Sequence, residues 1–231
     1  MPSKNAVKEY EPGGFYHLYN RGVEKRLIFM NEMDYSVFIS FLAMYLSPCD
    51  DLQGVSSQVY LPDKVSPSKA LKNYFGDIKL LGYCLMPNHF HLFVKQESDH
   101  GIDHFMRSLS TKYVRYFNSK YKRVGSLFQD TYKGVRVESE YQFVYLSKYI
   151  HRNPLGIACE DTPCRLEDYR HSSYGNYLGK YWQSWLETDE ILSLFGSLNK
   201  RISYANYREF VEETSDQDHT FIKDVVIDID F

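Results

Sequence analysis

Residues 77–96, DIKLLGYCLMPNHFHLFVKQ, decide the fold. Two runs rich in apolar and aromatic residues flank the turn pair Pro87-Asn88, which is typical of a β-hairpin. Side chains two residues apart in a strand point to the same face of the sheet. The second strand therefore presents His89 and His91 on one face. Its other face carries apolar side chains and is expected to join the core: Phe90, Leu92 and Val94.

The two histidines have a specific chemical use. Two imidazoles a few ångströms apart can clamp a divalent metal when a third ligand reaches them. A lone His-x-His pair on a strand is more often structural, so the metal hypothesis requires a partner from another element.

The segments around this hairpin predict a small α+β domain. Apolar periodicity and turn residues predict strands at 15–20, 77–86, 89–96 and 131–137, and helices at 34–46 and 102–121. Ser139 with Gln142 forms a capping box that opens another helix, which Pro154 should end near Asn153. The order of elements predicts a ferredoxin-like antiparallel sheet (split βαβ) with helices on one face and a C-terminal helical extension.

The chain should divide near residue 158. We expect a catalytic domain over 1–158, with an irregular insertion at about 47–76 that is rich in Ser, Pro, Asp and Gly. The extension, 159–231, begins with turn and loop at 172–179 and continues with short helices at 189–198 and 204–213. Its acidic end, 215–231, fits either a flexible tail or a late edge strand.

Composition favours a cytoplasmic protein without a membrane span. The longest apolar runs are shorter than the roughly 18 residues that a span needs, and the N-terminus lacks the apolar core of a signal peptide. The cysteines show no paired spacing and are expected to be reduced thiols: Cys49, Cys84, Cys159 and Cys164.

The net charge of −3 conceals a strong asymmetry. Residues 107–136 hold eight basic residues and one acid, whereas 209–231 hold eight acids and one lysine. A basic middle of this kind fits a phosphate-binding surface, although an ordinary solvated helix face is the commoner explanation of a charge run. Candidate DNA contacts are Arg21, Arg107, Lys112, Arg115, Lys133, Arg136 and Arg152.

The helix after Ser139 supplies the partner that the histidines need. Tyr149 and Asn153 are four residues apart and share one helix face. If this helix packs beside the sheet, Asn153 Oδ1 can complete a metal site with the two imidazoles. Tyr149 then lies one turn away as a nucleophile. Tyr145 and Tyr141 are its rivals on the same face, but only Tyr149 adjoins Asn153.

This arrangement suits phosphoryl chemistry. A phenol with a pKa near 10 is a poor nucleophile at neutral pH, and a cation on a phosphate oxygen makes phosphorus more electrophilic. Imidazole and oxygen ligands together favour Mg²⁺ or Mn²⁺.

The sequence resembles the HUH single-tyrosine transposases of the insertion-sequence type, and most closely the REP-associated tyrosine transposases. The matching segments follow the family's order over about residues 13–180: NRG (20–22), MPNHFHLFV (86–94), YFN (116–118), GSLFQDTYK (125–133), YIHRNP (149–154) and SSY (172–174). Two departures are the long insertion at 47–76 and LGIACED (155–161), a loose match to the family's usual continuation.

The resemblance implies His89 and His91 as metal ligands, Tyr149 as nucleophile and Asn153 as third ligand. It also implies single-stranded or hairpin DNA as substrate, a 5′-phosphotyrosine intermediate, and a monomer or homodimer. Two alternatives are a domesticated DNA-binding regulator with the same fold and a metallohydrolase of small phosphate esters. The remaining histidines singled out, His17, His104, His151 and His171, are predicted to lie at the surface or in turns.

Overall fold

The computed structural model describes residues 9–48, 72–156, 165–202, 204–213 and 218–226. Within these ranges, four strands form one antiparallel sheet in the order β2-β3-β1-β4. The strands are β1 (Phe15–Arg21), β2 (Ile78–Met86), β3 (His89–Gln96) and β4 (Lys133–Val137). This order and the antiparallel pairing confirm the predicted ferredoxin-like α+β class.

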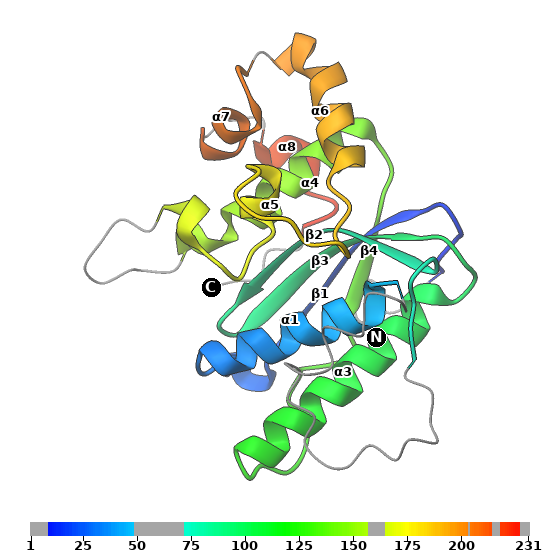
Figure 1. Ribbon diagram of the computed structural model, residues 1–231, viewed down its shortest axis with the longest axis vertical. Helices are drawn as coiled ribbons and strands as arrows, with labels where there is room; N and C mark the ends of the chain where they lie inside the picture. The colour runs from blue at the N-terminus through cyan, green and yellow to red at the C-terminus, as the bar shows by residue number, and fades with distance from the viewer. Residues whose placement is uncertain (1–8, 49–71, 157–164, 203, 214–217, 227–231) are drawn as a thin grey trace.

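Two long helices cover one face of the sheet (Figure 1). They are α1 (Glu32–Leu46), which follows β1, and α3 (Gly101–Lys120), which follows β3. Their apolar side chains pack against alternate residues of the strands. As predicted, the strand side chains on this face include Phe90, Leu92 and Val94.

The opposite face of the sheet is covered as well. Helix α4 (Glu140–Arg152) lies across it and is backed by three helices of the extension: α6 (Asp189–Ile202), α7 (Tyr207–Glu212) and α8 (Asp218–Ile222) (Figure 1). Leu81, Cys84 and Phe93 pack against α4 on this side. The two helices that cover the first face are α1 and α3, as predicted. Helix α4 and the extension form a second helical layer on the other face.

Helix α4 begins and ends close to the predicted positions. Ser139 is the N-cap, and its hydroxyl accepts a hydrogen bond from the Gln142 N–H at 3.1 Å. The Gln142 side chain accepts in return from the Glu138 N–H at 2.8 Å, one residue earlier than in a standard capping box. At the other end Asn153 keeps helical dihedral angles despite Pro154 and leads into the 3₁₀ turn η3 (Asn153–Gly156).

Shorter elements connect these layers, and two expectations need comment. The 3₁₀ helices η1 (Val23–Lys25) and η4 (Leu166–Asp168) lie in connections, and α5 (Tyr174–Tyr177) forms where only turn and loop were expected. Residues 218–222 form helix α8 rather than an edge strand, because Phe221 packs on Tyr141 and Tyr145 of α4. The insertion lies largely outside the described residues, as do Cys49, Cys159 and Cys164, whereas Cys84 is a buried free thiol.

Candidate active site

The sheet presents two histidines toward α4. His89 and His91 are buried on β3, on the side opposite the apolar Phe90 and Leu92. Across the strand pairing, His91 lies opposite Tyr19 and His89 lies opposite Arg21. We call this side of the sheet the histidine face, defined by His17, Tyr19, His89 and His91.

Helix α4 brings a tyrosine and an asparagine to the histidine face. The ring centroids of His91 and Tyr149 are 5.5 Å apart. Asn153 Oδ1 lies 3.4 Å from His89 Nε2, and Asn153 Nδ2 donates a hydrogen bond to the Tyr149 carbonyl at 3.0 Å. Tyr149 and Asn153 are four residues apart, and Asn153 keeps helical geometry. Both side chains therefore lie on the helix side that faces His89 and His91.

The hydrogen bonds around His89 fix where its lone pair points. His89 Nδ1 donates to Asn88 Oδ1 at 2.7 Å, so the neutral ring carries its lone pair on Nε2. Asn153 Oδ1 is also an acceptor, and its direction is set by the bond from Nδ2 to the helix carbonyl. His89 Nε2 and Asn153 Oδ1 lie 3.4 Å apart as two acceptors, and a cation bound by both would stabilise this arrangement.

His91 presents a buried acceptor as well. Among the described residues its Nε2 has no hydrogen-bond partner, while its Nδ1 lies 2.9 Å from His17 Nε2. A buried polar atom without a partner is uncommon and calls for an explanation such as an ion. The side chains of His89, His91 and Asn153 thus direct three acceptors into one region.

Burial keeps both imidazoles neutral. It lowers the pKa of His89 to about 4, with smaller opposing and reinforcing effects from Asn153 and Arg21. It also lowers the pKa of His91 well below its usual 6.5, reinforced by the neighbouring His89 and His17. The neutral ring is the form that binds metals.

The donor set fits a hard divalent cation held partly by water or substrate. In the part of the chain that the structure describes, no group of three His, Cys, Asp or Glu side chains is placed to hold a metal. The candidate centre therefore depends on an amide oxygen, from Asn153, as its third protein ligand. Carbonyl-type oxygen is a ligand suited to Mg²⁺ and Mn²⁺, which commonly retain water or phosphate oxygens.

The rival tyrosines occupy different environments from Tyr149. Tyr145 is buried and packs edge-on against Phe210 at a ring distance of 5.2 Å. Tyr141 stacks on Phe221 at 4.9 Å and lies more than three helical turns from Asn153. Tyr149 is half-buried and adjoins both His91 and Asn153.

Two of the four remaining histidines were predicted wrongly. His17 is buried on β1, with its ring 5.1 Å from that of His91, because its strand lies in the interior of the sheet. His151 is buried between the sheet and the extension, and it contacts the Tyr207 hydroxyl at 3.0 Å and Ser173 Oγ at 2.8 Å. His104 is exposed and His171 lies in a turn, as predicted.

Ser173 explains why the SSY segment lies near the site. Its hydroxyl receives the Tyr83 N–H at 2.9 Å and contacts the Tyr83 carbonyl at 3.2 Å, next to the irregular pairing between Leu80 and Gly82. Ser173 and His151 therefore tie β2 to α4 through buried polar contacts, and their role here is structural.

Two of the seven predicted DNA contacts lie on the histidine face. Arg21 pairs in register with His89, and its guanidinium donates to Gln129 Oε1 at 3.1 and 3.3 Å. Lys133 on β4 lies opposite Tyr19 and is half-buried.

The other five lie elsewhere. Arg107 and Arg115 are exposed on α3, behind the sheet. Lys112 lies over the Phe41 ring of α1 at 5.0 Å. Arg136 pairs with Glu11 at 2.7 Å, and Arg152 donates to the Val211, Glu212 and Glu213 carbonyls at 2.7–3.3 Å.

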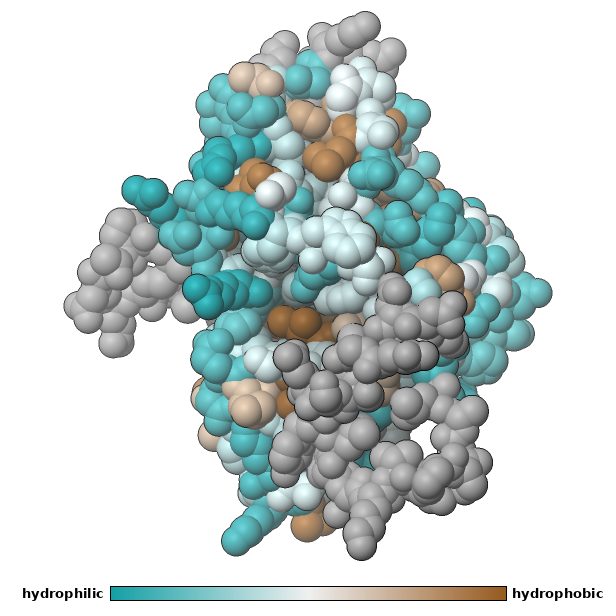
Figure 2. Space-filling view, viewed as in Figure 1, coloured by the Kyte–Doolittle hydropathy of each residue, from teal (hydrophilic) through white to brown (hydrophobic). Residues whose placement is uncertain are grey.

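The basic helix and the candidate active site therefore do not share a groove. Helix α3 packs on the face of the sheet opposite the histidines, because its apolar residues bury against α1 and the strands there. The basic residues of this helix therefore do not line the region beside Tyr149. On the face that Figure 2 shows, hydrophilic side chains predominate and apolar ones form small separate spots.

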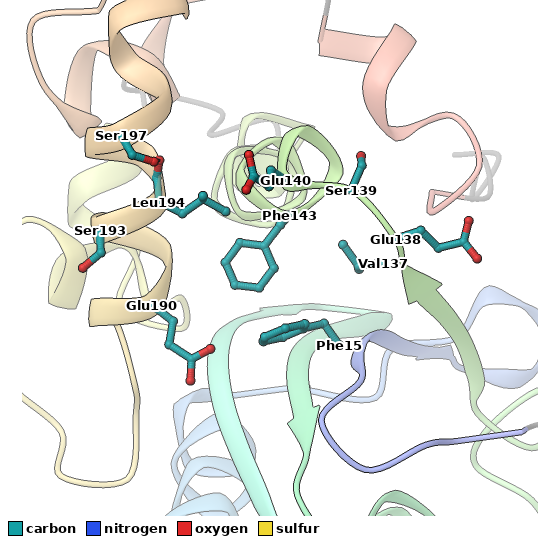
Figure 3. Close-up of a pocket in the computed structure, with 10 residues that line it drawn as sticks. All are labelled: Phe15, Val137, Glu138, Ser139, Glu140, Phe143, Glu190, Ser193, Leu194 and Ser197. Carbon is teal, nitrogen blue, oxygen red and sulfur yellow. The ribbon is translucent and has the colours of Figure 1, made fainter.

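A pocket of about 580 Å³ lies at the other end of α4. Phe15, Phe143 and Leu194 form apolar parts of its wall, and Glu138, Glu140 and Glu190 add carboxylates (Figure 3). Negative charge there disfavours a phosphate ligand. Phe143 is six residues before Tyr149, so the pocket is distinct from the candidate active site.

Sequence reasoning missed the residues that support the metal ligands. Asn88 was assigned only to the turn, His17 to the surface, and the end of the extension to a tail or edge strand. Strand alternation does put His17 and Tyr19 on one face, but only the strand pairing shows that this face is shared with His91.

Comparison with known proteins gives one family model that matches part of the chain. Residues 68–153 match the family model described as "Transposase IS200 like", and this segment includes β2, β3, α3, β4, α4 and Asn153. No curated protein matches. The solved structure of a REP-associated tyrosine transposase bound to a REP hairpin is similar to this chain, with a TM-score of 0.47 and 11% identity over 80% of this chain and 92% of that one. No helix among the described residues is long and apolar enough to cross a membrane.

Proposed function

We propose that this chain, whose residues 68–153 match the family model described as "Transposase IS200 like", is a metal-dependent DNA strand transferase. It cleaves and rejoins single-stranded DNA beside hairpins through a covalent 5′-phosphotyrosine intermediate. Tyr149 is the nucleophile, and His89, His91 and Asn153 hold Mg²⁺ or Mn²⁺.

One observation carries this proposal. Three acceptor atoms, His89 Nε2, His91 Nε2 and Asn153 Oδ1, are directed into one region beside a half-buried tyrosine. A regulator that only bound DNA would not need a buried His91 Nε2 that has no hydrogen-bond partner among the described residues. The hydrogen bond that Asn153 Nδ2 donates to the Tyr149 carbonyl further couples the proposed third ligand to the helical turn of the nucleophile.

The chemistry conserves the phosphodiester bond energy. Tyr149 Oη attacks the scissile phosphorus, a Tyr–O–P bond forms, and the P–O3′ bond breaks. The phenol proton passes to water, and the leaving 3′ oxygen takes up a proton. A 3′-OH later attacks the same phosphorus and releases Tyr149, so no nucleotide cofactor is required. A bound Mg²⁺ or Mn²⁺ would offset the charge that grows on the phosphate oxygens.

The chain's own residues orient the strand for this attack. Arg21 and Lys133 flank the histidine face on neighbouring strands and are suited to phosphate contacts. The phosphate contacts set the register of the backbone, and the turn of α4 sets the position of the phenol. Positioning and electrostatics then do most of the catalytic work.

The test is formation of a protein–DNA adduct. Full-length protein is incubated with single-stranded hairpin oligonucleotides and Mn²⁺, and denaturing gels are used to detect a DNA-linked protein band. Y149F should abolish the band while DNA affinity, measured by fluorescence anisotropy, stays within about twofold of wild type. Chelation of the metal with EDTA should abolish the band as well.

Y141F is the matched control because it removes a hydroxyl from the same helix at another half-buried position. It should form the adduct at the wild-type rate. An adduct with Y149F, or its loss with Y141F, would assign the nucleophile to a different residue.

A further inference from the structure

His17 joins the candidate metal site to the end of the chain. His17 Nδ1 lies 2.8 Å from the Val225 carbonyl oxygen, and His17 Nε2 lies 2.9 Å from His91 Nδ1. Both rings are buried and nearly parallel, with an interplanar angle of 20°. Val225 follows α8, whose Phe221 packs on α4.

The chemistry of the acceptor sets the direction of both hydrogen bonds. A carbonyl oxygen only accepts, so His17 Nδ1 carries a proton and donates it to Val225. Both ring nitrogens of His17 contact neutral groups, the Val225 carbonyl and His91 Nδ1, and a buried charge without a counter-charge is costly, so the ring is neutral. His17 Nε2 therefore accepts from the N–H at His91 Nδ1.

This hydrogen bond determines the protonation of His91 Nε2, the other ring nitrogen. A neutral imidazole with a proton on Nδ1 has its lone pair on Nε2, which is the buried atom without a partner. Without the acceptor at His17, the proton of His91 is free to occupy Nε2 and block the lone pair.

We propose that His17 is a positioning residue of the metal site, anchored by the Val225 carbonyl, and that it holds His91 in the tautomer that can ligate a cation. This inference rests on the proposed function insofar as His91 is a ligand. The C-terminal extension then contributes to the site, because the carbonyl that anchors His17 belongs to Val225, 208 residues further along the chain. His17 and Val225 both lie outside the segment that matches the family model.

Packing alone does not account for a histidine at this position. An apolar ring of similar size would fill the space between Tyr19, His91 and Tyr149, whose rings lie 4.9–6.1 Å from that of His17. It would leave the His91 N–H and the Val225 carbonyl without partners, which costs free energy in a buried site. The hydrogen-bond chain is the feature that requires an imidazole.

Two substitutions test separately the two hydrogen bonds of His17, one to Val225 and one to His91. The amide of glutamine reaches about where imidazole Nε2 lies, so H17Q keeps an acceptor for His91. The shorter asparagine places its amide about where Nδ1 lies, so H17N keeps the donor to Val225 and loses the acceptor. H104N, at an exposed histidine, is the control for the substitution itself.

The first readout is the tautomer of His91, measured without metal by long-range ¹H–¹⁵N NMR on full-length protein. The wild type and H17Q should carry the proton on Nδ1, and H17N should shift it toward Nε2. The second readout is Mn²⁺ affinity, measured by electron paramagnetic resonance. H17N should weaken binding about 10–100-fold, as loss of an outer-sphere partner typically does. H17Q should stay within about threefold of wild type, and H104N should match it.

Two results would overturn the inference: a wild-type His91 protonated on Nε2, or an H17N protein that binds Mn²⁺ as tightly as wild type. Thermal melting of each variant identifies loss of folding, and the wild-type tautomer is informative without any variant. Protein that shows the expected tautomer and Mn²⁺ ranking but forms no DNA adduct would contradict the strand-transferase proposal and leave the role of His17 in place.

Discussion

At the scale of single residues, the motif YIHRNP combines two kinds of role. Tyr149 and Asn153 face the histidines, whereas His151 points into the interior and bonds to Tyr207 and Ser173. Adjacent positions on a helix point about 100° apart, so one short segment can serve both the site and the packing behind it. The position of a residue in a motif therefore does not define its role.

The buried His151 predicts acid sensitivity. Burial lowers its pKa to about 3, against about 6.5 in the unfolded chain. Below pH 6.5 His151 is protonated in the unfolded state but stays neutral in the folded state. The contribution of His151 to the free energy of unfolding is therefore full above pH 6.5 and falls as the pH drops toward 3. Each such histidine contributes up to about 1.4 kcal/mol per pH unit in this window.

Urea unfolding at pH 7 and pH 5 tests this prediction. The wild type should lose stability over this interval, and H151Q should lose about 2 kcal/mol less than wild type, whatever its stability at pH 7. H104Q changes an exposed histidine and should keep the wild-type slope. Equal slopes for H151Q and wild type would show that His151 takes up its proton without unfolding.

At the scale of elements, α4 depends on the extension for its position. α6, α7 and α8 all pack against it, and Phe221 of α8 contacts two of its tyrosines. Arg152, at the end of α4, donates to the three carbonyls that close α7. Carbonyls at a helix C-terminus lack partners within the helix, and a guanidinium satisfies them well.

Arg152 is therefore expected to stabilise the fold rather than bind DNA. R152A should lower the free energy of unfolding by about 2 kcal/mol, because charged hydrogen bonds to partly buried carbonyls are lost. Urea unfolding provides the measurement, and R107A, an exposed arginine of α3, should change stability by less than about 0.5 kcal/mol. An R152A protein of full stability and reduced DNA affinity would restore the original assignment to DNA binding.

At the scale of the whole molecule, the sheet separates two surfaces. Tyr149 and the histidines lie on the side of the sheet that α4 and the extension cover. Helix α3, which carries the exposed Arg107 and Arg115, packs on the opposite face (Figure 1). Under the proposed function, a single strand bound at Tyr149 would first contact Arg21 and Lys133. The arginines of α3 can meet DNA only where it extends around the molecule.

This separation predicts different effects for the two sets of basic residues. R21A and K133A should each slow adduct formation on a short unstructured oligonucleotide. Each should also reduce the slope of log affinity against log salt by roughly 1, since one phosphate contact is lost. R107A and R115A should leave both quantities unchanged on that substrate. Anisotropy titrations across a salt series measure the slopes, and a reduced slope for R115A would place the short strand across α3 instead.

The sequence by itself determined which side chains share a face within one strand or one helix. The period of two put the histidines of β3 on one face, and the spacing of four put Tyr149 and Asn153 on one helix face. The resemblance in sequence is supported over residues 68–153, which match the family model described as "Transposase IS200 like". These features depend on neighbours within a few residues, so they can be inferred without coordinates.

Tertiary structure decided which of those faces meet and what supports them. The pairing of β1 with β3 brought His17 to His91, and the packing of α8 on α4 brought Val225 to His17. It also placed the basic helix α3 on the face of the sheet opposite the histidines, which the charge pattern alone did not indicate. Such contacts join residues that are far apart in sequence and arise from burial and hydrogen-bond satisfaction across the whole molecule, which no local pattern encodes.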